Sequence, residues 1–212
     1  MKKLFENWQK FLTEENKTFP YQIYCDMDGV LVDFITGAVN QINADLKDEA
    51  VAGKSIDKLR RKLSELGRDQ VTLQDLSKMD KKNRLQPARK YMYKRLQDNE
   101  EFWATLPLTE DGLELWAYIS EFGPYILTAP MQGEGSKRGK DIWIEDHLSP
   151  KPLKVFKSHE KYNWAVDESG QPNVLIDDFE INTTPWEQAG GIAILHTSTN
   201  STIQQLEELM KK

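Results

Sequence analysis

The sequence of 212 residues contains a single cysteine, Cys25. One cysteine excludes an internal disulfide framework, so a reducing compartment is the simpler expectation. The sequence also has no uninterrupted apolar stretch long enough for a signal peptide or a membrane-spanning helix. We therefore expect a cytoplasmic protein with no membrane partner.

Positively charged residues are in the minority: the sequence has 28 Lys and Arg and 34 Asp and Glu, which give a formal net charge of -6. This balance argues against stable nucleic-acid binding. It is compatible with a small anionic substrate, because a phosphate site needs only local positive charge. There is no internal repeat and no low-complexity tract. The length fits one compact α/β domain, or a core with a small inserted cap.

Short apolar runs alternate with amphipathic segments along most of the chain. Strands are predicted over residues 21–25, 124–127, 153–156, 173–176 and 191–195, and helices over 34–46, 110–122, 136–148 and 201–210. Strands separated by helices predict a doubly wound, mainly parallel sheet, whose ligands bind beyond the carboxyl ends of the strands. Residues 21–47 and 100–212 would form this α/β core.

Two segments do not fit the alternation. Residues 48–99 are rich in charged residues and leucine, and we interpret them as a helical cap insertion. We interpret the basic residues of this insertion as lying on solvent-exposed faces of its helices. The alternative is that they form a positively charged surface that attracts a polyanion. Residues 1–20 predict an amphipathic helix docked on the body, with a partner or membrane contact as the alternative.

Polar residues follow three of the predicted strands. Asp26 and Asp28 come after the first strand, Thr128 after the second, and Asp177 and Asp178 after the fourth. The strands deliver these groups to the same rim of the sheet. Four carboxylates brought together would repel one another unless a cation lies among them, and an all-oxygen site suits Mg²⁺.

The motifs around these residues resemble those of a known family. DMDGVLVDF from Asp26 to Phe34, then ILTAP, a lysine and LIDD resemble the four ordered motifs of the haloacid dehalogenase (HAD) phosphatases. The long first motif, with TAP, a KxxWxxxHL segment and LIDD, resembles in particular the 5'(3')-deoxyribonucleotidases. The resemblance covers roughly residues 21–46 and 102–195 and does not extend to the insertion.

The first motif carries the chemistry that this resemblance implies. Asp26 would attack phosphorus and form an aspartyl-phosphate, with Mg²⁺ and fixed donors stabilising the charge on the phosphoryl oxygens. Asp28 would give a proton to the leaving alkoxide and later take one from water. Gly29 would let the backbone turn sharply and approach the phosphate.

The other motifs would complete the site. Thr128 and the backbone amide of Ala129 would hold a phosphoryl oxygen. Asp177 would bind Mg²⁺ directly, together with Asp26 and the main-chain carbonyl of Asp28. Asp178 would act through a water or by orienting basic groups, although the division of roles between Asp177 and Asp178 stays open.

The residue that neutralises the nucleophile and the phosphate is a lysine that spacing alone does not select. The candidates that precede LIDD are Lys137, Lys140, Lys154, Lys157 and Lys161. The context of Trp143 and His147-Leu148 favours Lys140, with Lys157 as the next candidate.

Three aromatic residues are candidates for a substrate pocket: Phe34, Phe102 and Trp103. Core packing is the alternative for each of them, and for Phe102 and Trp103 it is the favoured one.

The sequence thus predicts a magnesium-dependent phosphomonoesterase that hydrolyses (deoxy)nucleoside monophosphates. Another phosphatase of the same superfamily, acting on a sugar phosphate or a polynucleotide 3'-phosphate, is the first alternative. A catalytically silent binding protein with the same fold is the second.

Overall fold

Five short strands form one parallel sheet in the computed structural model, which describes residues 19–77, 82 and 84–211. They are β1 (Ile23–Cys25), β2 (Tyr125–Thr128), β3 (Lys154–Lys157), β4 (Val174–Asp177) and β5 (Ile192–Leu195), in the order β3-β2-β1-β4-β5. The three residues of the central strand β1 are all buried, as expected for a strand covered on both faces. The predicted α/β fold with a doubly wound sheet is confirmed.

The register of the sheet brings the strand ends to one rim. Cys25 at the end of β1 lies opposite Ile126 of β2 and Ile176 of β4. Thr128 and Asp177 are therefore the last residues of the strands on either side of β1, and Asp26 follows β1 directly. The polar residues of the sequence motifs meet at this edge.

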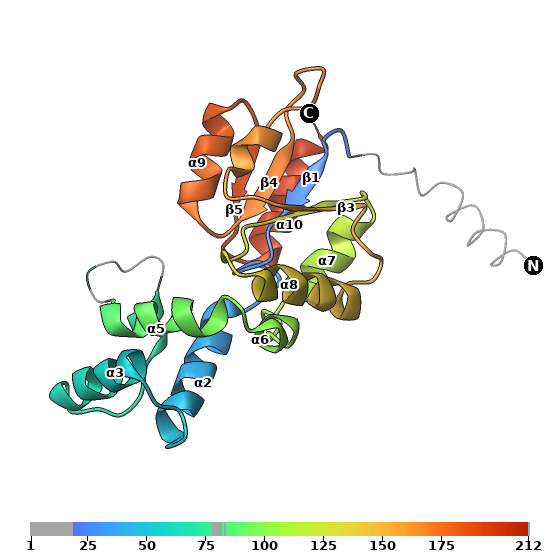
Figure 1. Cartoon of the computed structure of the whole chain (residues 1–212). Helices are drawn as coiled ribbons and strands as arrows, with labels where there is room; N and C mark the ends of the chain where they lie inside the picture. Colours follow the sequence, from blue (N-terminus) through green and yellow to red (C-terminus); the bar gives the residue numbers. More distant parts are fainter. Residues whose placement is uncertain (1–18, 78–81, 83, 212) are drawn as a thin grey trace, which may run out of the picture.

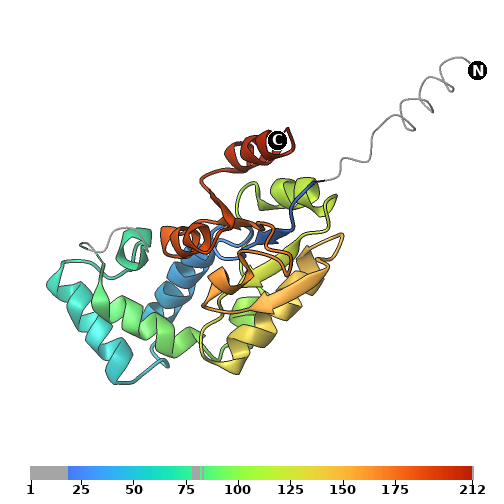
Figure 2. The same cartoon turned by 90° about the horizontal axis from the view of Figure 1, so that it is seen from above.

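Helices lie on both faces of the sheet (Figures 1 and 2). They are α6 (Glu100–Ala104), which packs against α8 (Glu134–His147), then α7 (Gly112–Ser120), α9 (Glu180–Gln188), α10 (Thr199–Leu209) and the short 3₁₀ turn η1 (Lys161–Trp164). Helix α9 was not predicted, because its sequence contains Asn182 and Pro185, which favour turns and helix ends. Trp186, fully buried, anchors this helix to the core.

A separate helical unit lies below the sheet in Figure 1. It contains α2 (Phe34–Lys47), α3 (Lys54–Glu65), α4 (Leu73–Leu76) and α5 (Gln86–Leu96). The sequence analysis placed the first of these helices in the core, but α2 packs against α4 and α5 of the insertion. Phe34 at its start stacks on Trp103 of α6, so α2 contacts both parts of the chain, and the predicted boundary at residue 48 stays a prediction.

A buried carboxylate joins the two long helices of this unit. Asp45 of α2 is 4% exposed and accepts hydrogen bonds from the Tyr91 hydroxyl at 2.7 Å and from Arg95 Nε at 2.9 Å, both in α5. Gln41 Nε2 donates to its other oxygen at 2.9 Å. Such a satisfied network costs little to bury and fixes α2 against α5.

The helix predicted over residues 1–20 lies outside the described residues, apart from its last two positions. Phe19 packs its ring against Tyr21 and Phe122, with ring centroids 5.8 and 5.5 Å away. Within the described part of the chain, no helix is long and apolar enough to cross a membrane.

Candidate active site

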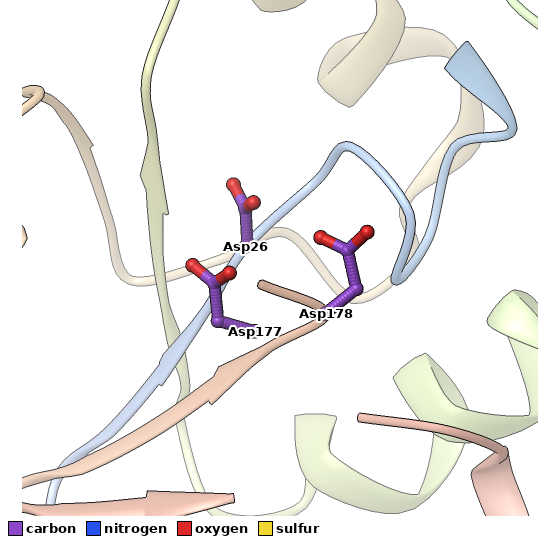
Figure 3. Close-up of side chains that lie close together, drawn as sticks. All are labelled: Asp26, Asp177 and Asp178. Carbon is purple, nitrogen blue, oxygen red and sulfur yellow. The ribbon is translucent and has the colours of Figure 1, made fainter. Parts of the chain in front are cut away.

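Three carboxylates converge at the rim of the sheet (Figure 3). Asp26 follows β1, Asp177 ends β4 and Asp178 follows it. One oxygen of each lies within 4.8 Å of the others, an arrangement that could hold a metal ion. Asp26 and Asp177 are 5% and 0% exposed, so their charges lie in a region of low dielectric and need compensation.

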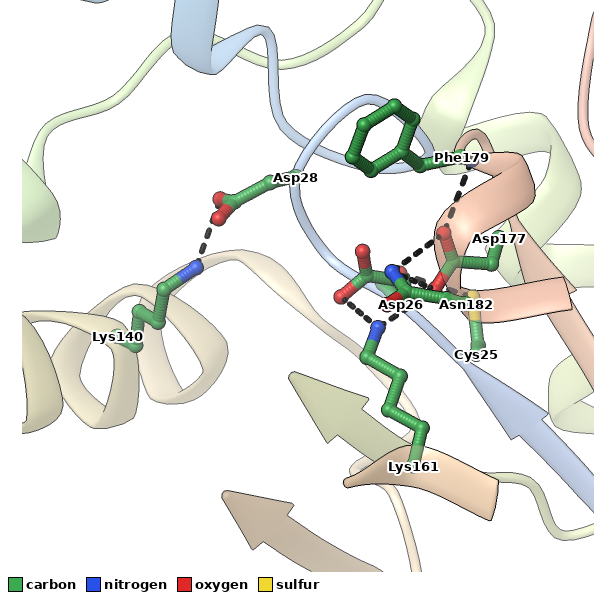
Figure 4. Close-up of polar contacts among 8 residues, drawn as sticks. All are labelled: Cys25, Asp26, Asp28, Lys140, Lys161, Asp177, Phe179 and Asn182. Carbon is green, nitrogen blue, oxygen red and sulfur yellow. Dashed lines mark hydrogen bonds and ion pairs between the residues drawn. The ribbon is translucent and has the colours of Figure 1, made fainter. Parts of the chain in front are cut away.

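A buried lysine supplies part of that compensation (Figure 4). Lys161 of η1, 2% exposed, places Nζ 2.9 Å from Asp26 Oδ1 and 2.6 Å from Asp177 Oδ2. Burial alone would lower the pKa of Lys161, but the two carboxylates outweigh burial and hold this pKa above its ordinary value. The ammonium therefore stays charged beside Asp26 at neutral pH.

Asp177 is held from a second side as well. The backbone N–H of Phe179 donates to Asp177 Oδ1 at 3.0 Å, and Asn182 Nδ2 lies 3.0 Å from both carboxylate oxygens. Burial, followed by the charge of Asp26, nevertheless raises the pKa of Asp177, although Lys161 and Asn182 act in the opposite direction. Both oxygens of this carboxylate are thus engaged by protein donors.

Asp28 pairs with a different lysine. Lys140 Nζ lies 2.7 Å from Asp28 Oδ1, and the Lys140 side chain is fully buried. The same ammonium lies 5.0 Å from the centroid of the Trp103 ring, within the range of a cation–π interaction. The lysine that the sequence favoured for neutralising Asp26 therefore contacts Asp28, and Lys161 occupies the position beside Asp26.

The other lysine candidate, Lys157, lies away from this cluster. It forms an ion pair with Asp141 of α8, in which the two side chains are 26% and 53% exposed. Exposure of this degree is typical of a surface ion pair, so the structure separates Lys157 from the carboxylates of the site.

Gly29 is required by a close approach in the turn after β1. Its φ is +89°, and a Cβ at this position would lie 2.2 Å from Asp178 Oδ2. The turn is closed by a hydrogen bond from Gly29 N to Val32 O at 2.8 Å. A side chain at residue 29 would displace Asp178, which explains why the motif needs glycine here.

Thr128 brings an unused hydroxyl to the same rim. Its side chain is fully buried, and Thr128 Oγ1 has no hydrogen-bond partner among the described residues. An unsatisfied buried hydroxyl costs about 1–3 kcal/mol. A ligand oxygen bound at the rim would remove that cost, and Ala129 follows directly with its backbone amide.

The three aromatic candidates pack on one another. Phe34, Phe102 and Trp103 are 7%, 7% and 2% exposed. The Phe34 ring stacks on Trp103 with centroids 5.2 Å apart and 10° between the planes, and Phe102 meets both rings edge-on. These contacts are those of a packed core at the joint between α2 and α6.

A cavity of about 480 Å³ opens beside this aromatic cluster. It lies between α2 and the segment that contains α6, and its lining includes Gln41, Arg95, Asn99 and Phe102. None of the carboxylates or lysines of the rim lines it.

Sequence reasoning missed Asn182 and Phe179, and it ranked Lys161 behind two other lysines. Asn182 follows Asp177 by five residues, so a helix beginning after LIDD would return its side chain toward the strand end. Because the helix was not predicted, this spacing carried no signal. The position of Lys161 depends on η1, a short turn that has no clear sequence pattern.

No protein-family model matches the sequence, and no curated protein matches it. Solved structures do. A hydrolase from Streptococcus pneumoniae TIGR4 is 15% identical with a TM-score of 0.52, and the match covers 88% of this chain and 98% of that one. YfnB of Bacillus subtilis, described as a HAD hydrolase bound to magnesium, is 14% identical with a TM-score of 0.52, covering 91% and 99%. The chain therefore has the fold of the HAD hydrolases.

Proposed function

We propose that the chain is a magnesium-dependent phosphomonoesterase that uses Asp26 as its nucleophile. The observation that carries this proposal is the buried ammonium of Lys161, 2.9 Å from Asp26 Oδ1 at the carboxyl end of the central strand. A buried carboxylate beside a fixed positive charge is suited to attack an electrophile, and the DMDG motif around it supports phosphorus as that electrophile.

The reaction would proceed in two displacements. A carboxylate oxygen of Asp26 forms a bond to phosphorus while the bond from phosphorus to the ester oxygen breaks, giving an aspartyl-phosphate and an alkoxide. The alkoxide takes a proton from Asp28, which would enter this step as the carboxylic acid, having bound a proton from solvent once the substrate phosphate replaces it as the partner of Lys140. Asp28 then takes a proton from water, which attacks the phosphorus of the aspartyl-phosphate, releases inorganic phosphate and regenerates Asp26.

Asp26 and Asp178 are the carboxylates best suited to hold the metal ion. The candidate metal-ligand atoms at the rim are carboxylate oxygens, which Mg²⁺ prefers. Asp177 already accepts hydrogen bonds from Lys161, Phe179 and Asn182, so its oxygens serve the lysine. Asp178 lies against Gly29 of the nucleophile turn. Bound Mg²⁺ would supply positive charge to the phosphoryl oxygens.

Lys140 holds Asp28 in the absence of substrate. The ion pair of 2.7 Å holds the Asp28 carboxylate, which is the proposed acid. The Lys140 ammonium in turn lies over the Trp103 ring, and that ring is held by its stack on Phe34. A phosphate entering the site adds negative charge within reach of Lys140. Lys140 would thus both position Asp28 and contribute to phosphate binding, with Thr128 and the Ala129 amide as further donors.

The substrate class that we propose is the (deoxy)nucleoside monophosphates. Its support is the resemblance of the long first motif, TAP, KxxWxxxHL and LIDD to the deoxyribonucleotidases. Phe34, Phe102 and Trp103 are engaged with one another, so a base would contact the edge of this cluster rather than displace a ring. A sugar phosphate or a polynucleotide 3'-phosphate remains the second candidate substrate.

Phosphate release from a panel of nucleoside monophosphates, sugar phosphates and a 3'-phosphorylated oligonucleotide tests this function, with Mg²⁺ and with chelator. We expect chelator-sensitive release that favours deoxynucleotides and is abolished in Asp26→Asn. Activity on another class alone would keep the chemistry and reject the substrate. No release from any compound would support a catalytically silent protein.

A further inference from the structure

Asn182, in the first turn of α9, carries a role that the motifs do not assign. We propose that it is a positioning residue that fixes Lys161 against the nucleophile, acting through Asp177. This inference rests on the proposed function, because it concerns the same reaction. It adds a residue outside the four motifs to the machinery of the site.

The contacts of Asn182 leave Asp177 a single orientation. Asn182 Nδ2 lies 3.0 Å from Asp177 Oδ1 and 3.0 Å from Asp177 Oδ2, and Phe179 N donates to Oδ1 from the same turn. Asp177 has no exposed surface, so water does not compete for its oxygens. The carboxylate therefore presents Oδ2 to Lys161 in a fixed place.

The position of the ammonium follows from that of Asp177. Lys161 reaches the site on a flexible four-carbon stem, which loses side-chain entropy when it is ordered. Its shortest contact is the 2.6 Å hydrogen bond to Asp177 Oδ2, and this bond holds Nζ 2.9 Å from Asp26. Asn182, Asp177, Lys161 and Asp26 thus form one continuous chain of polar contacts (Figure 4).

A simpler interpretation is that Asn182 only ties the end of β4 to the start of α9. Loss of its amide would then lower the stability of the fold and leave Lys161 where it is. In the positioning role, loss of the amide frees Asp177 to rotate, and the ammonium moves with it. The two interpretations differ in what happens to Lys161, which can be observed directly.

The test follows the lysine ammonium groups of the full chain by NMR, with ¹⁵N-labelled lysine and no substrate. The variants are Asn182→Ala and Asn182→Leu, since leucine keeps the side-chain size and removes the donor. We expect the Lys161 ammonium protons to exchange with water about tenfold faster in both variants, as for loss of one hydrogen bond to a charged group. The Lys140 signal is the internal control and should not change.

The matched control variant is Asn163→Ala, in η1 beside Lys161. Asn163 donates to Glu160 at 3.3 Å in an exposed contact and does not touch Asp177. It should leave the Lys161 signal unchanged. If Lys161 exchanged at the wild-type rate in both Asn182 variants, the positioning role would be wrong whatever their activity.

Kinetics provide the second readout. Asn182→Leu should lower kcat about tenfold with little change in KM, because the ammonium contributes most when negative charge develops on the phosphoryl oxygens and the attacking group in the transition state. A loss of thermal stability with unchanged kcat would favour the simpler interpretation. If the wild-type chain released no phosphate, the proposed function would fail, while the NMR comparison would still decide whether Asn182 fixes Lys161.

Discussion

Replacement of Lys161 by methionine tests the electrostatic design of the site. The change removes the ammonium from between Asp26 and Asp177, which are 5% and 0% exposed. Loss of one partner from a buried ion pair costs about 3–5 kcal/mol, because the remaining charge is left uncompensated. We expect Lys161→Met to lower the free energy of unfolding by this amount.

Urea unfolding followed by tryptophan fluorescence measures the effect, in chelator so that no divalent cation replaces the ammonium. With an m value of about 1–3 kcal/mol per molar urea, the midpoint should fall by at least about 1 M. Lys157→Met is the matched control. Its ion pair with Asp141 is partly exposed, so its loss should cost no more than about 1 kcal/mol.

A second variant separates lost charge compensation from lost packing. Asp177→Asn in the Lys161→Met background removes one of the two buried negative charges and keeps the shape of the side chain. The double variant should be more stable than Lys161→Met by at least about 1 kcal/mol. The reasoning is refuted if the double variant is no more stable, or if Lys161→Met unfolds within about 1 kcal/mol of the wild type.

Three further changes test other parts of the site and fold. Gly29→Ala places a Cβ 2.2 Å from Asp178 Oδ2 and should lower turnover more than about tenfold, as measured by steady-state kinetics. The control Gly67→Ala has φ +69° and open space around its Cβ, so it should only lower the free energy of unfolding by about 1–2 kcal/mol, as measured by urea unfolding. Thr128→Val removes a buried hydroxyl without a described partner, so we expect unchanged or higher stability and a kcat/KM at least about tenfold lower; a large loss of stability would contradict this. Burial lowers the pKa of His196, so the unfolded chain binds the proton first and stability should fall as pH drops below about 6.5. His196→Gln should flatten this dependence, and parallel pH profiles of Tm would contradict the assignment.

The fold followed from the sequence because its signals are local. Short apolar runs of β-strand composition separated by helical patterns specify a parallel sheet, and all five strands were predicted within a few residues of their bounds. The meeting of Asp26, Thr128 and Asp177 was also predictable, since the ends of neighbouring parallel strands lie at one rim. The boundary of the insertion stays a prediction, because α2 packs on α4 and α5 and, through Phe34, also on Trp103 of α6.

The tertiary structure alone decided which basic and carboxylate groups pair. Lys140 and Lys161 are both fully buried and both precede LIDD, yet one lies on α8 and contacts Asp28, while the other lies on η1 and contacts Asp26. Sequence spacing states at which strand end a residue lies. It does not state where a flexible side chain ends, which depends on the rotation and packing of the element that carries it.

The same limit applied to the division of roles between Asp177 and Asp178, which the sequence left open. These neighbours share one motif, and only the return of α9, which brings Asn182 back to the strand end, shows that Asp177 faces the lysine. The sequence by itself thus determined the sheet, the rim and the set of oxygen donors. The folded chain decided their partners, because each partner comes from an element distant in sequence and its approach is fixed by packing.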